Sequence, residues 1–164
     1  MNYKKLVYEY SNFPIDGVSF KDISPLLASS EFDNAVKEMG DLVEKPDFWV
    51  GIESRGFIFA SALSIKFGGG LLLCRKAGKL PGNIITKSYN TEYSTDSLSI
   101  KYGKGNVVIV DDVLATGGTM SASIELVRMC GADIIGVCCF IELDFLKGRE
   151  KFDRNIVTSS LINY

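Results

Sequence analysis

The sequence contains no histidine among its 164 residues. This absence excludes metal sites of the Cys/His type, and it excludes nucleophiles that depend on a histidine base, such as Ser-His and Cys-His pairs. Any proton transfer at a catalytic site must therefore use a carboxylate, a lysine, a tyrosine or the substrate itself.

The sequence also lacks an apolar run long enough to cross a membrane. The longest runs, such as residues 134–141, fall well short of the ~20 residues that a spanning helix needs. The opening segment MNYKKLVYEYSNF has neither the apolar core nor the cleavage site of a signal peptide. The four cysteines show no CxxC spacing and lie in apolar or helical stretches. We therefore predict a cytoplasmic protein with no membrane partner.

An excess of positive charge is missing as well. The chain has 18 Lys and Arg against 20 Asp and Glu, which gives a net charge of -2. A domain that binds the nucleic-acid backbone is normally strongly basic, so we expect no nucleic-acid partner. Hydrophobic residues make up 46% and charged residues 23%, as in ordinary globular proteins. The length predicts a single domain over residues 1–164.

The apolar pattern alternates between helix and strand. Short apolar runs predict strands at 48–52, 71–74, 107–110 and 134–141, and a further strand at 156–161. Helices are predicted at 3–10, around Phe32 to Val43, at 56–67 (apolar all round, hence buried) and at 117–130. Residues 75–91 show no period and are predicted to form a long functional loop. This alternation predicts an α/β fold with a parallel sheet between helices, and ligands beyond the carboxyl ends of its strands.

The most informative of these strand ends reads VVIVDDVLATGGT from Val107 to Thr119. An apolar run leads to two carboxylates, and a short loop then enters a helix through Thr-Gly-Gly-Thr. Glycine amides, threonine hydroxyls and a helix N-terminus together form a cradle for a phosphate group. Because the acids would repel phosphate, they are better suited to a pair of hydroxyls or to a metal ion. The alternative, an ordinary helix cap beside two solvated acids, fits a bare TGGT better than this combination.

Two further strand ends carry groups that bind anions. The first reads GIESRG from Gly51 to Gly56, where backbone amides and Arg55 could hold an anion. The second reads RKAGKLPG from Arg75 to Gly82, with three cations within five residues. A capped helix with a surface arginine and a solvated basic loop are the alternative interpretations. Three anion-binding patterns at three strand ends favour a phosphorylated ligand over both.

The segment from Asp111 to Thr119 resembles the phosphoribosyl diphosphate (PRPP) motif of the type I phosphoribosyltransferases. The resemblance implies that family's fold: a central, mostly parallel sheet flanked by helices, an N-terminal base-binding hood over residues 1–30 and a flexible catalytic flap over 76–100. It also implies a cis peptide at Glu53–Ser54. The residues implied to bind PRPP are Asp111, Asp112, Ala115, Thr116, Gly117, Gly118, Thr119, Ser54, Arg75, Lys76, Lys79 and Tyr93.

The segment FPIDGVSFKDISPLL, from Phe13 to Leu27, narrows the resemblance to the adenine phosphoribosyltransferase branch of that family. It implies that adenine lies between Phe20 and Val113, and that the backbone of Ser19 and Lys21 reads its edge. Relatives that use hypoxanthine or guanine usually carry an aspartate where this chain has Ala115, so that acid is absent here.

By the same resemblance, the chain transfers the phosphoribosyl group of PRPP to adenine and releases AMP and pyrophosphate. Arg55 would stabilise the departing charge, and Glu92 on the flap would manage the proton of the base. Mg²⁺ is the expected cofactor, bound mainly through the pyrophosphate and water, with no metal site made by the protein alone. A homodimer is also implied. Two alternatives remain: transfer to another base, such as xanthine or hypoxanthine, and a non-catalytic regulator that binds PRPP.

Overall fold

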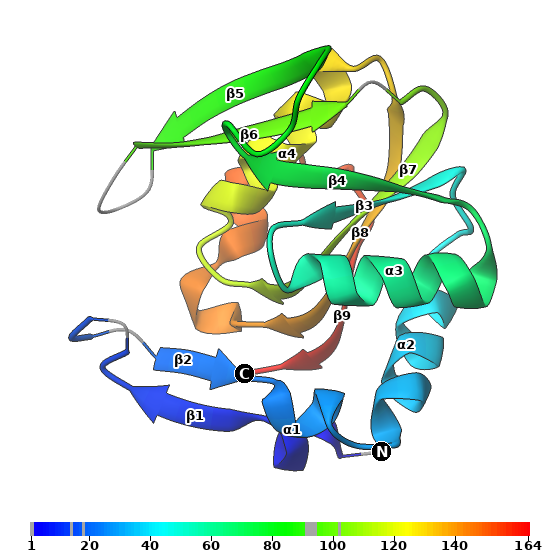
Figure 1. Cartoon of the computed structure of the whole chain (residues 1–164). Helices are drawn as coiled ribbons and strands as arrows, with labels where there is room; N and C mark the ends of the chain where they lie inside the picture. Colours follow the sequence, from blue (N-terminus) through cyan, green and yellow to red (C-terminus); the bar gives the residue numbers. More distant parts are fainter. Residues whose placement is uncertain (1, 14, 18, 91–94, 102) are drawn as a thin grey trace.

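The centre of the molecule is a seven-stranded sheet with the strand order β5-β6-β4-β3-β7-β8-β9 (Figure 1). This computed structural model describes residues 2–13, 15–17, 19–90, 95–101 and 103–164. The strands are β3 (Phe48–Ile52), β4 (Gly70–Lys76), β5 (Ile84–Asn90), β6 (Thr95–Lys101), β7 (Asn106–Leu114), β8 (Asp133–Glu142) and β9 (Thr158–Asn163). The neighbours from β4 to β9 pair in parallel. Strands β6 and β5 add an antiparallel edge. The predicted mostly parallel sheet is therefore confirmed.

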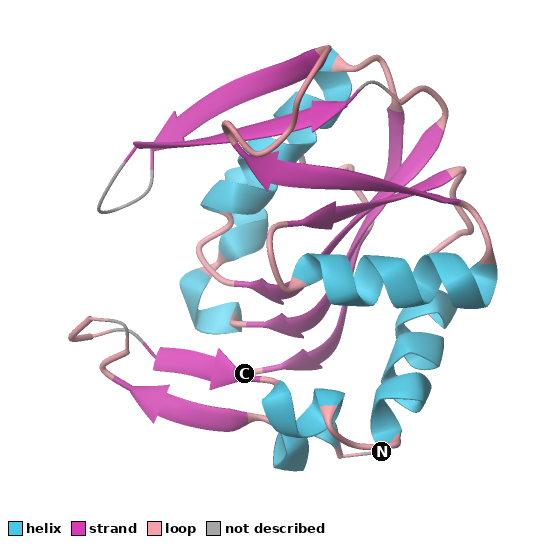
Figure 2. Ribbon diagram, viewed as in Figure 1, coloured by secondary structure: helices cyan, strands magenta, loops and turns pink. Residues whose placement is uncertain are grey.

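Helices cover both faces of this sheet (Figure 2). Helices α2 (Glu31–Asp41) and α3 (Gly56–Phe67) pack on one face, and α4 (Gly118–Met129) packs on the other. The short helices are η1 (Tyr3–Leu6), α1 (Ser24–Leu27), η2 (Asp144–Leu146) and η3 (Gly148–Lys151). In the described part of the chain, no helix combines the length and apolar character needed to cross a membrane.

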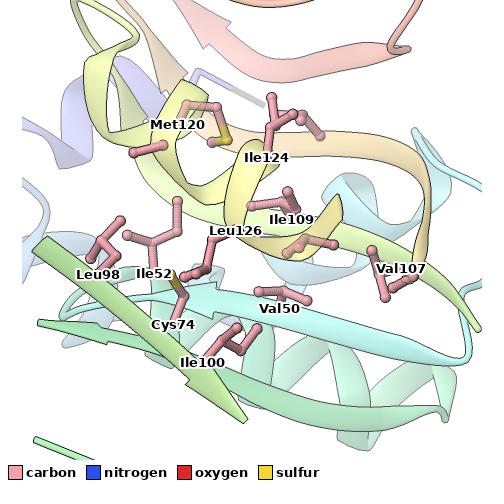
Figure 3. Packing of buried hydrophobic residues seen from close by; sticks show 14 of the residues in the cluster. Val50, Ile52, Cys74, Leu98, Ile100, Val107, Ile109, Met120, Ile124 and Leu126 are labelled. Carbon is pink, nitrogen blue, oxygen red and sulfur yellow. The ribbon is translucent and has the colours of Figure 1, made fainter. Parts of the chain in front are cut away.

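Strand β7 is covered on both faces, which accounts for the uninterrupted apolar residues in its sequence. Val107 and Ile109 point into the core beneath α4, which Figure 3 shows from close by. Val108 and Val110 point into the other core, beneath α2 and α3. Because successive side chains of a strand face opposite sides, a sheet covered on both faces needs apolar residues at every position. The predicted strand at 107–110 is confirmed, but it continues to Leu114.

The N-terminal segment forms a hairpin, which we call the hood hairpin, from β1 (Tyr8–Ser11) and β2 (Ser19–Asp22). The predicted helix at 3–10 is therefore wrong beyond the short η1 turn. Strand β1 pairs antiparallel with β2, and Glu9 lies directly opposite Lys21. The spacing of the apolar residues fitted a helix, but pairing with a segment ten residues away decided the structure.

The predicted long loop at 75–91 is also wrong in part. Strand β4 continues to Lys76, and β5 and β6 form an antiparallel pair that the sequence did not reveal. Ile85 and Tyr89 are half-buried and pack against the core beneath α4, so one face of β5 is partly covered. Apart from Ile84, its other positions are polar, and the hydroxyls of Thr86 and Ser99 lie 2.8 Å apart across the strands. Lysine and serine at the intervening positions hid this alternation.

Two smaller differences concern exposure and boundaries. Helix α3 was predicted to be buried on all sides, but Ile58 is 39% exposed and Ile65 is 87% exposed. The last strand, predicted at 156–161, begins and ends two residues later. The four cysteines are free and buried, as expected for side chains within apolar runs.

Candidate active site

A cavity of about 330 Å³ lies where the hood hairpin faces the carboxyl ends of β3 and β7. It brings together residues that are far apart in the sequence. The hood hairpin contributes Ser19, Phe20 and Lys21; the turn after β3 contributes Glu53, Ser54 and Arg55; β7 and the loop after it contribute Asp111, Asp112, Val113, Ala115 and Thr119. Carboxyl ends of parallel strands meet at one edge of a sheet, which is why these three clusters converge.

The loop before α4 lines a smaller cavity of about 80 Å³ beside the first, formed with Thr116, Gly117, Gly118 and Thr119. Gly117 has a φ of 81°, and a Cβ there would lie 2.1 Å from the carbonyl oxygen of Gly148. Glycine is therefore the residue that fits this turn. At Gly118, where α4 begins, a Cβ would meet no atom within 4 Å. The open space lies at the helix N-terminus, where the helix dipole favours an anion.

Of the two acids of β7 beside this loop, Asp112 is buried and Asp111 is half-buried. Asp112 is 5% exposed, and its backbone N–H donates a hydrogen bond of 2.9 Å to Oδ1 of Asp111. Burial raises the pKa of Asp111, and the neighbouring Asp112 carboxylate raises it further. Burial also raises the pKa of Asp112, although the Arg55 guanidinium opposes this. Two adjacent carboxylates with raised pKa values and no assigned structural role are typical of a functional site.

Arg55 connects the acids to the hood hairpin. Its Nε lies 2.8 Å from Oδ2 of Asp112. Its Nη1 donates a hydrogen bond of 2.9 Å to the carbonyl oxygen of Lys21. The guanidinium carbon lies 4.8 Å from the centre of the Phe20 ring. Beyond this ion pair with Arg55, Asp112 Oδ2 has no hydrogen-bond partner in the described part of the chain. A buried acceptor atom in this state is ready to receive a hydrogen bond from a ligand.

The turn after β3 is fixed by Glu53. Its Oε2 accepts a hydrogen bond of 2.9 Å from the backbone N–H of Lys76 and one of 3.3 Å from Nε of Arg75. Burial alone would raise the pKa of Glu53, but these two donors outweigh it and the pKa is lowered. The Glu53–Ser54 peptide is cis, as the resemblance implied.

The basic residues at and after the end of β4 do not converge on one site, although the sequence predicted that they would. Arg75 contacts Glu53 and also donates from Nη1 to the carbonyl oxygen of Lys79 at 3.2 Å. The Nζ of Lys76 lies 3.5 Å from Asp96 Oδ2 on β6. Among the described residues, these three cations line neither cavity. Glu92 and Tyr93 lie outside the described residues.

Sequence reasoning did not assign a role to three residues that shape the site. Glu53 organises Arg75 and Lys76, Leu143 lines the larger cavity, and Gly148 supports the loop at Gly117. Glu53 carried a detectable signal, because it is a carboxylate within a cluster of anion-binding groups. A Cβ at Gly148 would lie 2.3 Å from the carbonyl oxygen of Ala115, and only the structure reveals that contact.

Comparisons with known proteins show sequence and fold similarity over nearly the whole chain. The family model described as the phosphoribosyl transferase domain matches residues 31–163. An adenine phosphoribosyltransferase from Geobacter metallireducens is 46% identical over 168 residues, which cover 96% of each chain. The crystal structure of an adenine phosphoribosyltransferase from Thermoanaerobacter pseudethanolicus superposes with a TM-score of 0.92 at 39% identity, covering 98% of this chain and 97% of that one.

A third relative is described with ligands. The Saccharomyces cerevisiae adenine phosphoribosyltransferase, complexed with an imino-altritol bisphosphate and adenine, superposes with a TM-score of 0.86 at 38% identity. The match covers 96% of this chain and 95% of the yeast chain.

The acid pair generates a prediction about stability. Because its raised pKa makes ionised Asp111 costly in the fold, Asp111→Asn should stabilise the protein at neutral pH. That cost is absent below the unfolded pKa of about 4, grows as the pH rises from there to the folded pKa, and is constant above it. We expect the variant to gain about 2–4 °C in Tm at pH 8, equivalent to about 1 kcal/mol, and less at pH 5. Thermal melts at both values test this, and a variant less stable than wild type at pH 8 would contradict it.

Proposed function

This chain belongs to the phosphoribosyl transferase family, and we propose that it transfers the 5-phosphoribosyl group of PRPP to N9 of adenine, giving AMP and pyrophosphate. The relatives named above are adenine phosphoribosyltransferases, and they match almost the whole chain. The observation that carries the proposal is the buried Oδ2 of Asp112, which has only the Arg55 guanidinium as a partner among the described residues and lies in a cavity beside an open helix N-terminus. A ribose with a 5′-phosphate offers both a hydroxyl and an anion.

The ribose and its 5′-phosphate fit the β7 end of the site. We place the phosphate on the loop from Ala115 to Thr119, where backbone amides and threonine hydroxyls donate hydrogen bonds. Asp111 and Asp112 accept hydrogen bonds from the 2′ and 3′ hydroxyls. The short distance between the two cavities supports this arrangement, because Asp111 and Ala115 line both of them.

Arg55 must change partners when the substrates bind. It occupies the Asp112 carboxylate, the Lys21 carbonyl and the face of Phe20, all of which the substrates need. The pyrophosphate of PRPP offers a stronger, doubly charged partner, so we infer that Arg55 turns toward it. Ser54, Arg75, Lys76 and Lys79 complete the anion site in this proposal. Together these groups stabilise the charge that develops on pyrophosphate as the bond to C1′ breaks.

The base is proposed to enter from beneath the hood hairpin. Phe20 and Val113 line the same cavity and can enclose a flat ring once the guanidinium has left. The carbonyl oxygen of Lys21 then accepts a hydrogen bond from the 6-amino group of adenine, in place of the bond from Arg55. The family model begins at residue 31, so the hood hairpin lies outside it. This supports a division in which the hood hairpin selects the base and the rest binds PRPP.

The residues present fit Mg²⁺ only as a partner of the substrate. No group of three or more Asp, Glu, Cys or His that could hold a metal occurs in the described ranges. Mg²⁺ commonly keeps several waters and binds through one or two carboxylates and substrate phosphates. Asp111 and Asp112 are suited to hold such waters. When bound, Mg²⁺ neutralises charge on the pyrophosphate.

Two further features belong to the proposal. A second copy of this chain is the proposed partner for the exposed apolar side of α3, where Ile58 and Ile65 face outward. Sedimentation would contradict the homodimer if the protein stayed monomeric at micromolar concentration. A cytoplasmic location is supported by the four free, buried cysteines, which suit a reducing compartment.

The function is tested by incubating the protein with PRPP and Mg²⁺ and, in separate reactions, adenine, hypoxanthine, guanine, xanthine, uracil or orotate. AMP should form from adenine alone. Turnover of another base would keep the PRPP site but refute the assignment of the hood hairpin. PRPP binding by calorimetry without turnover of any base would instead favour a non-catalytic regulator.

A crossed pair of variants tests where the two substrates lie. Gly118→Ala places a methyl group in open space, so the fold should be unaffected while the phosphate is crowded, and the KM for PRPP should rise about tenfold. Phe20→Ala removes one face of the base site and should raise the KM for adenine about tenfold. Steady-state kinetics with each substrate varied should show opposite patterns. Parallel rises in both KM values for either variant would refute its placement.

The proposed acid–base group is Glu92, between β5 and β6. Glu92→Gln keeps the shape and removes the ionisable group, so kcat should fall by about 10²-fold. Pre-steady-state and steady-state rates with saturating PRPP and adenine measure this. A variant that keeps full kcat would remove Glu92 from the chemistry, and Glu44→Gln, at an exposed position between α2 and β3, serves as the matched control.

A further inference from the structure

Lys21 has an unusual environment for a lysine. Its side chain is only 5% exposed, and its Nζ lies 2.7 Å from Oε2 of Glu9. The same Nζ lies 4.1 Å from the centre of the Tyr164 ring. A buried ammonium group is unfavourable unless other groups replace its hydration. Glu9 is largely exposed, so its carboxylate supplies only part of that replacement, and the aromatic face supplies another part.

Tyr164, the last residue of the sequence, is held firmly against the main sheet. Its backbone N–H donates to the carbonyl oxygen of Glu142, and its carbonyl oxygen accepts from the N–H of Asp144, both at 2.9 Å. A second ammonium group, Nζ of Lys4, lies 4.6 Å from the centre of the same ring. In Figure 1 the end of the chain lies beside β2. The ring thus joins the N-terminal segment to the body of the protein.

The groups that contact Lys21 connect the hood hairpin to different parts of the molecule. Glu9 lies opposite Lys21 within the hood hairpin, so that ion pair joins β1 to β2 and does not attach the hairpin to anything else. Arg55 does attach the hairpin to the sheet, through the Lys21 carbonyl. In the proposed reaction, however, Arg55 leaves that carbonyl when PRPP binds. The Tyr164 contact does not involve Arg55 and persists when it turns away.

We propose that Tyr164 is a positioning residue of the base site. Its ring contacts the Lys21 ammonium and thereby fixes the backbone of β2 in the position from which it binds adenine. This inference rests on the proposed function, because it takes the backbone of Ser19 and Lys21 as the part that reads the base. The Lys21 side chain faces the ring while residues 19–21 line the cavity. Loss of the ring lets β2 shift, so adenine binding weakens while the PRPP groups on β7 stay in place.

The test compares steady-state kinetics of the full chain with Tyr164→Leu and Tyr164→Phe. Leucine keeps an apolar side chain without an aromatic face, and phenylalanine keeps the face without the hydroxyl. From the strength of cation–π contacts, Tyr164→Leu should raise the KM for adenine about two- to thirtyfold. The KM for PRPP should change less than twofold, and Tyr164→Phe should behave like wild type.

Two further variants separate positioning from damage to the fold. Asn163→Ala removes hydrogen bonds to Asp144 at the same end of β9 without touching Lys21, and should leave both KM values unchanged. Lys21→Met removes the ammonium and should raise the KM for adenine as Tyr164→Leu does. The effects of the two changes should be less than additive in the double variant of Lys21 and Tyr164, because both remove the contact between these residues.

Three results would overturn the inference while leaving the function intact: an unchanged KM for adenine in Tyr164→Leu, an equal rise in Tyr164→Phe, or a parallel rise in the KM for PRPP. A wild-type protein that forms no AMP from adenine and PRPP would overturn the proposed function and this inference together. The two failures are therefore distinguishable in the same set of assays.

Discussion

The loss of hydration at two adjacent carboxylates near the end of β7 is the constraint on which the rest of the site depends. Asp112 is buried and Asp111 is half-buried, and this desolvation raises the pKa of both. Arg55 relieves part of that cost through its ion pair with Asp112. Arg55 extends from the turn after β3 to reach Asp112. Its other contacts, with the Lys21 carbonyl and the Phe20 ring, hold the hood hairpin beside the acids. One arginine therefore links the two strand ends and the N-terminal hairpin.

This link also explains how the site can exchange its contacts at low cost. Every group that Arg55 holds is an acceptor or an aromatic face, and each of these suits a part of the proposed substrates. A diol can replace the guanidinium at Asp112, and an amino group can replace it at the Lys21 carbonyl. The acids are already desolvated without substrate, so that part of the cost is met before the proposed substrates arrive. Preorganisation of this kind is what makes charge stabilisation effective in catalysis.

The sequence predicted those parts that depend on local pattern. The run from Val107 to Thr119 identified a buried strand, two acids and a helix start, because each is encoded within a few residues. Contacts between distant segments were not predictable: Arg55 and Lys21 are 34 residues apart, and no period connects them. The pair β5 and β6 was missed because Lys87 and the serines made the pattern look like a loop. The implied cis peptide at Glu53–Ser54 came from the resemblance alone, and so did the base.

The separation of the hood hairpin from the family model suggests why base choice can vary while PRPP chemistry does not. Residues 31–163 include the two acids, the loop from Ala115 to Thr119 and Arg55. The hairpin would read the base through its backbone, which presents the same donors and acceptors whatever its side chains are. What the side chains of β2 then determine is where that backbone lies. Phe20 faces the cavity and Lys21 faces Tyr164, so each neighbouring residue fixes the strand from a different side. Selectivity for adenine becomes a matter of how firmly a short hairpin is held in place.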